Sequence, residues 1–231
     1  MKCLLCVCLA GALGAAAELA LSNVMQSPPL QKGISVQMAV TNNASPMPDA
    51  DNADAWIVTV TEPGKTYFGV HAVSLDGLTE QMKSRPRNHG QKLYIKADAR
   101  ASYANVQKAL SAGRAAFFDA PVLLTSQATP AEPGTIVPPK GLEVLAGTSA
   151  GAELPLVRVL NPGQARPMVE IDNQRIPLTA LPSTLSRALQ NRESKVVLVM
   201  AGGPLRFADV VHVIDVCRGT GARVILDLPQ L

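Results

Sequence analysis

The residues Gly147-Thr148-Ser149-Ala150-Gly151 fit the G-x-S-x-G pattern, in which a serine is the nucleophile of a hydrolase. That chemistry needs a sharp turn from a strand into a helix, because such a turn exposes the serine hydroxyl. Here Pro155 follows and leads into a strand, and the motif lies in a Pro- and Gly-rich stretch. We therefore interpret Ser149 as a linker residue and predict that the protein is not an enzyme. An exported serine hydrolase is the least favoured alternative.

The spacing of the cysteine and histidine residues does not favour a metal site. Cys3, Cys6 and Cys8 lie in an apolar leader, Cys217 lies near the end of the chain, and the three histidines are far apart. A zinc site needs two ligand pairs at short spacing, and only the Cys3–Cys6 pair has such a spacing. We predict no metal, no cofactor and no catalytic residue.

Two glycine-rich turns could suggest phosphate loops. Neither Gly202-Gly203 nor Gly219-Thr220-Gly221 continues as a nucleotide-binding motif. Gly202-Gly203 precedes a predicted helix, whose first backbone amides could bind an anion. A plain turn is the preferred interpretation.

Composition narrows the class of protein. The chain has 231 residues, of which 47% are hydrophobic and 17% charged, which is enough apolar material for a packed core. Its net charge is +3, and it has only four Phe, three Tyr and one Trp. Nucleic-acid grooves need clustered aromatic and basic side chains, so we predict no nucleic-acid partner.

The amino end resembles an export signal. Met1-Lys2 precedes an apolar run from Cys3 to Ala17, and Ala15-Ala16-Ala17 would place cleavage before Glu18. The apolar character resumes after Glu18, so an imperfect membrane span over 3–25 is the alternative. Residues 1–25 are therefore a signal peptide or a membrane anchor, and either interpretation predicts that the rest of the chain is exported.

Two stretches rich in proline divide the remaining chain. Residues 26–55 predict an extended tether, and residues 127–153 predict an interdomain linker. Between and after them lie two segments, 56–126 and 154–231, whose patterns match each other.

Each segment predicts the element order β-β-α-β-α-β. A strand from Trp56 or Leu156 enters a Pro-Gly turn and a second strand, and Val73-x-Leu75-x-x-Leu78 or Ile176-x-Leu178-x-x-Leu181 then opens a helix. The remaining expected elements are strands 93–97 and 197–201, helices 103–112 and 207–217, and final strands 121–125 and 223–228. The predicted fold class is α/β, built as an α+β two-layer sandwich in two tandem modules.

The first module carries a family resemblance. The stretch from Leu30 to Val36, the hairpin around Gly64-Lys65, and Leu93-Tyr94-Ile95-Lys96-Ala97-Asp98-Ala99-Arg100 with Tyr103-Ala104-Asn105-Val106 resemble the ExbD/TolR family of biopolymer transport proteins. The resemblance covers about residues 28–126, and 154–231 is similar to a degenerate second copy, in which Ala97-Asp98 has become Ala201-Gly202. The family's signature turn corresponds here to Lys96, Asp98, Arg100 and Tyr103.

The resemblance implies a function and partners. Family members have one amino-terminal membrane helix and a periplasmic domain that tends to form homodimers. They work with an ExbB/TolQ-like channel subunit and use the proton-motive force to energise a TonB/TolA-like protein of the TonB or Tol-Pal systems. The implied location is the inner membrane with periplasmic domains, or the periplasm after signal cleavage. The alternative is an exported cell-wall or protein binding module without motor function.

This sequence departs from the family pattern at the acidic residue that handles the proton. The family's membrane helix carries an aspartate that handles the proton, whereas this sequence has no Asp before Asp49. Glu18 is the only acid near the equivalent region and is out of register with it. The preferred interpretation is that Glu18 marks the start of the mature protein, and the alternative is that it handles the proton in a retained membrane anchor.

Overall fold

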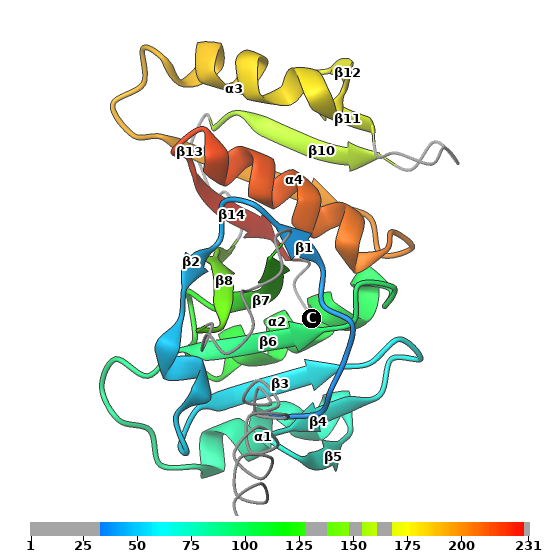
Figure 1. Ribbon diagram of the computed structural model, residues 1–231, viewed down its shortest axis with the longest axis vertical. Coiled ribbons are helices and arrows are strands. Elements are labelled where there is room, and N and C mark those ends of the chain that lie inside the picture. The colour runs from blue at the N-terminus through cyan, green and yellow to red at the C-terminus, as the bar shows by residue number, and fades with distance from the viewer. Residues whose placement is uncertain (1–32, 128–137, 148–153, 161–167, 229–231) are drawn as a thin grey trace, which may run out of the picture.

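The computed structural model describes residues 33–127, 138–147, 154–160 and 168–228. Two mixed sheets with helices packed on them make an α+β architecture, which confirms the predicted fold class at that level. Figure 1 shows the two sheets stacked along the long axis, with α4 next to the boundary between them.

The first sheet has the order β2-β8-β7-β6-β3-β4-β5, and β1 pairs with β7 beside this path. Its strands are β1 (Val40–Thr41), β2 (Ser45–Pro46), β3 (Trp56–Val60), β4 (Thr66–Phe68), β5 (His71–Val73), β6 (Leu93–Ala97), β7 (Val122–Gln127) and β8 (Lys140–Glu143). The central strands β3, β6 and β7 are parallel, and their register pairs Val58 with Ile95 and Ile95 with Leu123. These strands are runs of apolar and β-branched residues because both faces of the sheet are covered.

Two helices cover one face of this sheet. The first, α1 (Leu75–Ser84), begins after Ser74, whose hydroxyl accepts the Gly77 N–H. The predicted helix start at Val73 is therefore wrong, since Val73 ends an additional strand, β5. The second helix, α2 (Tyr103–Ala115), begins where the sequence predicts and buries Val106, Leu110 and their neighbours.

The second sheet has the order β12-β11-β10-β13-β14-β9. Its strands are β9 (Leu145–Gly147), β10 (Leu156–Leu160), β11 (Met168–Ile171), β12 (Gln174–Pro177), β13 (Val196–Ala201) and β14 (Arg223–Asp227). As in the first sheet, a central parallel pair has an antiparallel hairpin on one side and a parallel strand on the other. Asp172 and Asn173 both have positive φ angles, 49° and 67°, as a two-residue hairpin turn requires.

Helices α3 (Leu181–Leu189) and α4 (Phe207–Gly219) cover the second sheet. The helix predicted from Ile176 begins later, because Ile176 belongs to β12 and a 3₁₀ turn (Leu178–Ala180) precedes α3. Leu181, Leu185 and Leu189 recur at helical spacing, and all three are buried.

Residues 33–55, which we call the strap, cross the other face of the first sheet. The strap contains β1, β2 and a 3₁₀ helix (Pro48–Asp51), and Met38, Met47 and Ala50 pack against sheet residues Tyr94 and Leu124. The described part of the segment predicted as an extended tether is therefore bound to the sheet. Its methionines and alanines supply the apolar surface that makes this packing favourable.

The described part of the predicted linker also forms strands. β8 pairs antiparallel with β7 in the first sheet, and β9 pairs parallel with β14 in the second. Only Val144 separates β8 from β9, and it is 1% exposed. The described part of this linker thus passes directly from the first sheet to the second, and the residue between the two strands is buried.

A single hydrophobic cluster runs through both halves. It contains Trp56 and Leu110 from the first half and Leu185 and Phe207 from the second. The two halves therefore share a core.

Candidate functional site

The turn that follows β6 is organised by one buried carboxylate. Asp98, which is 4% exposed, accepts the Gln37 N–H at 3.2 Å and the Arg100 N–H at 3.0 Å. The Arg100 guanidinium adds two hydrogen bonds to the same carboxylate, at 3.0 and 3.2 Å. Bonding to this guanidinium, together with the backbone N–H groups, lowers the pKa of Asp98 against the opposing effect of burial.

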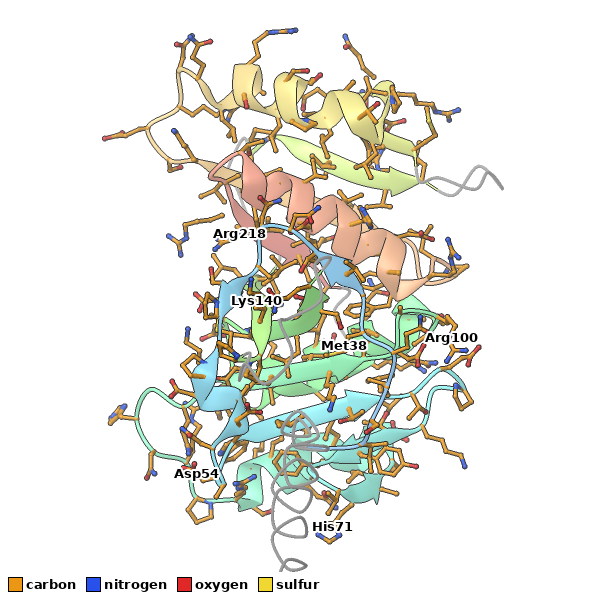
Figure 2. The ribbon with its side chains drawn as sticks, viewed as in Figure 1. Met38, Asp54, His71, Arg100, Lys140 and Arg218 are labelled. Atoms are coloured by element: carbon orange, nitrogen blue, oxygen red, sulfur yellow. The ribbon has the colours of Figure 1, made fainter. Side chains whose placement is uncertain are left out.

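Arg100 connects this turn to the β3–β4 hairpin. Its Nη1 lies 2.9 Å from a carboxylate oxygen of Glu62, and the side chains of both residues are about half exposed. Figure 2 shows Arg100 at the periphery of the molecule, near the level where the two halves meet. In this cluster Asp98 is buried and hydrogen-bonded, whereas the side chains of Glu62 and Arg100 face solvent.

Lys96 does not join this cluster. It lies two residues before Asp98 on β6 and is 3% exposed, on the strand face opposite to Ile95 and Ala97. Desolvation lowers the pKa of its amine, and nearby Asp51 in the strap opposes that effect. Lys96 therefore belongs to the interface between sheet and strap.

Tyr103 lies in the shared core at the start of α2. It is 1% exposed, and among the described residues its hydroxyl has no hydrogen-bond partner. Burial, and secondarily the charge of Asp227, raises the pKa of Tyr103 well above its ordinary value. The structure thus brings Asp98 and Arg100 together and places Lys96 and Tyr103 elsewhere.

A second buried carboxylate holds the strap to the other half of the molecule. Asp215 on α4, 3% exposed, accepts the N–H groups of Asn42 and Asn43 at 3.0 and 2.8 Å. The Asn43 side chain donates in return to the Asp215 carbonyl at 3.0 Å. Figure 1 shows the strap running from the first sheet to α4. Asp98 and Asp215 therefore bind successive parts of one segment.

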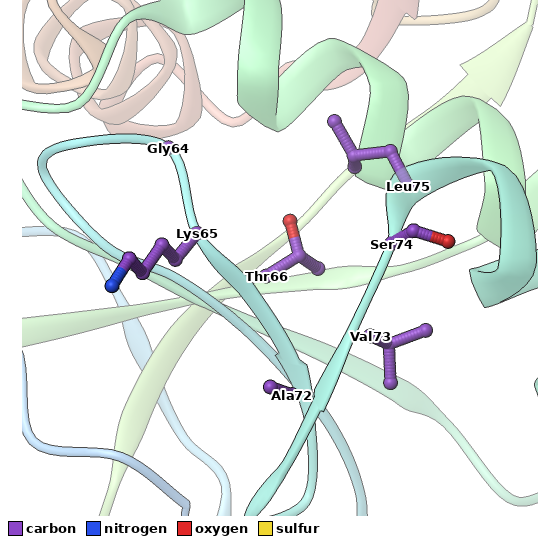
Figure 3. Close-up of a pocket in the computed structure, with 7 residues that line it drawn as sticks. All are labelled: Gly64, Lys65, Thr66, Ala72, Val73, Ser74 and Leu75. Atoms are coloured by element: carbon purple, nitrogen blue, oxygen red, sulfur yellow. The ribbon is translucent and has the colours of Figure 1, made fainter.

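A shallow groove of about 340 Å³ lies between β4, β5 and the start of α1. Figure 3 shows Thr66 facing the space beside Val73 and Leu75, with Lys65 directed away from them. The Thr66 hydroxyl has no hydrogen-bond partner among the described residues. The wall of this groove is mostly apolar, and its polar side chains are Lys65, Thr66 and Ser74, of which Ser74 already caps α1.

The other candidate site residues predicted from the sequence either lie outside the described residues or are already hydrogen-bonded. Ser149 and Glu18 lie outside the described residues. The amides at the start of α4 are not free for an anion, because the Phe207 and Ala208 N–H groups donate to the carbonyls of Ala101 and Ala99 at 2.8 and 2.9 Å. Within the described ranges, no group of three potential metal-binding side chains occurs.

Sequence reasoning missed the residues that complete the site. Gln37 binds Asp98 from 61 positions away, and Asn42 binds Asp215 from 173 positions away. Neither residue type nor local spacing signals such contacts, because a backbone N–H is present at nearly every residue.

Residues 19–128 match the family model described as biopolymer transport protein ExbD/TolR. This region of the chain, which carries the first half of the fold, is therefore similar to the ExbD/TolR family. No curated protein and no solved structure matches the chain. The matched region contains the strap, Glu62 and the Asp98–Arg100 turn, and it ends before β8.

ExbD/TolR proteins are membrane-associated transport components with a periplasmic domain, and the family is not one of enzymes. Within the described part of this chain, no helix has the length and apolar character that a membrane crossing needs.

Proposed function

We propose that this chain is a periplasmic component of a transport machine coupled to the proton-motive force, and that it acts through protein contacts. Its partners would be an ExbB/TolQ-like channel subunit and a TonB/TolA-like protein. The carrying observation is the family match over residues 19–128, which includes the complete strap and the charged turn that binds it.

The strap suggests how such a component could transmit movement. It follows the predicted leader in sequence and is bound to the first half by Asp98 and to the second half by Asp215. Charge-assisted hydrogen bonds are stronger than neutral ones, so a displacement of the strap is passed to both halves. Glu62 and Arg100 are the exposed residues next to the first of these attachments.

We also propose that 56–126 and 154–231 are two ExbD/TolR-like modules. Strand order β5-β4-β3-β6-β7 in the first sheet corresponds to β12-β11-β10-β13-β14 in the second. Gly202 and Pro204 follow β13 where Asp98 and Arg100 follow β6, so the second module lacks the charged turn.

Photo-crosslinking in cells tests the proposed contact. A crosslinking amino acid at Glu62 should capture a TonB/TolA-like protein, and the yield should fall when the proton-motive force is dissipated. The same amino acid at Glu193, an exposed residue of the second half, is the matched control. Equal capture at both positions, or capture that ignores the proton-motive force, would contradict the proposal.

The absence of an aspartate before Asp49 favours a second candidate, an exported binding module without motor function. Amino-terminal sequencing of the membrane-extracted protein distinguishes the two. A mature end at Glu18 and release into the periplasm would favour the binding module and exclude a proton role for Glu18. An intact leader and copurification with an ExbB/TolQ-like subunit would favour the transport role, and Glu18→Gln would then test proton handling directly.

A further inference from the structure

The starts of α2 and α4 are bound to each other across the boundary between the two halves. Tyr103 N–H donates to the Leu205 carbonyl at 2.8 Å, and Phe207 N–H donates to the Ala101 carbonyl at 2.8 Å. Around them, Ser102 and Arg206 form an isolated antiparallel bridge. The first backbone amides of each helix, which have no partner inside their own helix, are thus satisfied by the turn of the other half.

A second pair of hydrogen bonds follows the same rule. Ala104 N–H donates to the Gly203 carbonyl at 3.0 Å, and Ala208 N–H donates to the Ala99 carbonyl at 2.9 Å. Within each pair of hydrogen bonds, the donor of one bond lies 104 positions from the donor of the other, and the two acceptors are also 104 positions apart. The two halves therefore make the same contacts to each other, with donor and acceptor exchanged. Reciprocal contacts of this kind define an isologous, two-fold interface, which normally joins two copies of one protein.

The contact is close and buried. A Cβ atom built on Gly203 would lie 3.1 Å from the Ala104 Cβ, so the glycine allows the two turns to approach. Tyr103 and Phe207, which correspond under the shift of 104, are both buried in the shared core. Residues 203–208 therefore cover the backbone of residues 101–104, while the Arg100 side chain beside them stays about half exposed.

We infer that the second half fills, within one chain, the surface through which the first module would pair with a second copy of itself. The chain is a covalently closed pair of modules, and this contact replaces the one that a homodimer would make at residues 99–104. Since Gly202 and Pro204 stand at the two-fold-related positions of Asp98 and Arg100, each closed pair carries a single charged turn. The inference rests on the proposed pair of modules and does not depend on the transport role.

A disulfide tests this arrangement. The hydrogen bonds from Tyr103 and Phe207 flank the Ser102–Arg206 bridge, so this is a non-hydrogen-bonded antiparallel pair, for which the Cα atoms are about 4.5 Å apart. That separation suits a disulfide. In the full chain with the leader cysteines changed to serine, Ser102→Cys with Arg206→Cys should oxidise almost completely to a bond within one chain. Cys217 is buried, and burial raises the pKa of its thiol to about 12, so it should not exchange.

Mixing the two single variants is the matched control. Ser102→Cys mixed with Arg206→Cys should give no disulfide between chains, because each chain covers its own surface. A yield of linked chains similar to that of the double variant would overturn the inference. A folded double variant that stays reduced would also overturn it. Should the double variant fail to fold, light scattering of the unmodified chain is the deciding measurement. A molar mass of one chain would support the closed pair. A dimer, in which mixed Ser102→Cys and Arg206→Cys chains become linked to each other, would oppose it.

Discussion

Asp98 illustrates how one residue joins segments far apart in sequence. Its carboxylate binds a strap residue on one side and Arg100 on the other. In Asp98→Asn the side chain keeps its size but presents an amide to a guanidinium, so we expect a loss of about 2 kcal/mol in the free energy of unfolding at pH 7. Urea denaturation measures this loss, and the exposed Asp119→Asn is the control, with an expected change close to zero.

The same variant should show a defined pH dependence. Hydrogen bonding to Arg100 lowers the pKa of Asp98 in the folded state, so its stabilisation is fully present above the unfolded value of about 3.9. It is lost as the pH falls through the lower folded pKa. The stability difference between the parent and Asp98→Asn should therefore stay constant from pH 7 to about 5 and shrink below about pH 4. A difference that grows on acidification would contradict this assignment.

Phe117 is held in a costly conformation at the end of α2. Its φ angle is 66°, and Phe118 N–H donates to the Gly113 carbonyl at 3.0 Å, as in a helix end that normally contains glycine. The side chain is 73% exposed, so little packing compensates for the strain. Phe117→Gly should raise the free energy of unfolding by about 1 kcal/mol. Ala115→Gly, two residues earlier in the helix, should lower it, and differential scanning calorimetry compares the two.

At the scale of elements, the strap is the segment that binds both halves. Asp215→Ala removes the acceptor of two strap N–H groups and leaves them in a buried setting, so we expect a loss of about 2–3 kcal/mol in the free energy of unfolding. Hydrogen exchange at the Asn42 and Asn43 amides should accelerate more than exchange in α1, which does not contact Asp215. Glu193→Ala is the control. Uniform acceleration throughout the chain would show that Asp215 supports the whole fold and has no selective effect on the strap.

At the scale of the whole molecule, the continuous core predicts cooperative unfolding. One hydrophobic cluster includes Trp56 and Phe207, β1 lies against α4, and β8 and β9 join the two sheets through buried Val144. Unfolding of either half would expose the apolar surface that the other half buries, which favours a cooperative transition. We expect one transition by calorimetry, with equal calorimetric and van't Hoff enthalpies. Two resolved transitions would show that the halves are independent domains.

The sequence by itself determined the elements whose signals are local. Apolar runs such as Leu93–Ala97 predicted strands, because a strand buried on both faces needs continuous apolar residues. Leu185 and Leu189 kept a helical spacing, and the Tyr103 and Phe207 helix starts were predicted correctly. The pairing of Asp98 with Arg100 could also be predicted from the sequence, since those residues are two positions apart and lie in a recognisable turn.

Only the tertiary structure decided where the polar and proline-rich segments lie. The composition of the strap indicated a tether, yet Asp98 and Asp215 supply acceptors for its backbone N–H groups from 61 and 173 positions away. The predicted linker likewise provides β8, which lies between β7 and β2 in the first sheet, and β9, which forms one edge of the second sheet. Backbone hydrogen bonds are nearly independent of side-chain type, so which segment fills an open edge or a buried acceptor depends on the assembled fold.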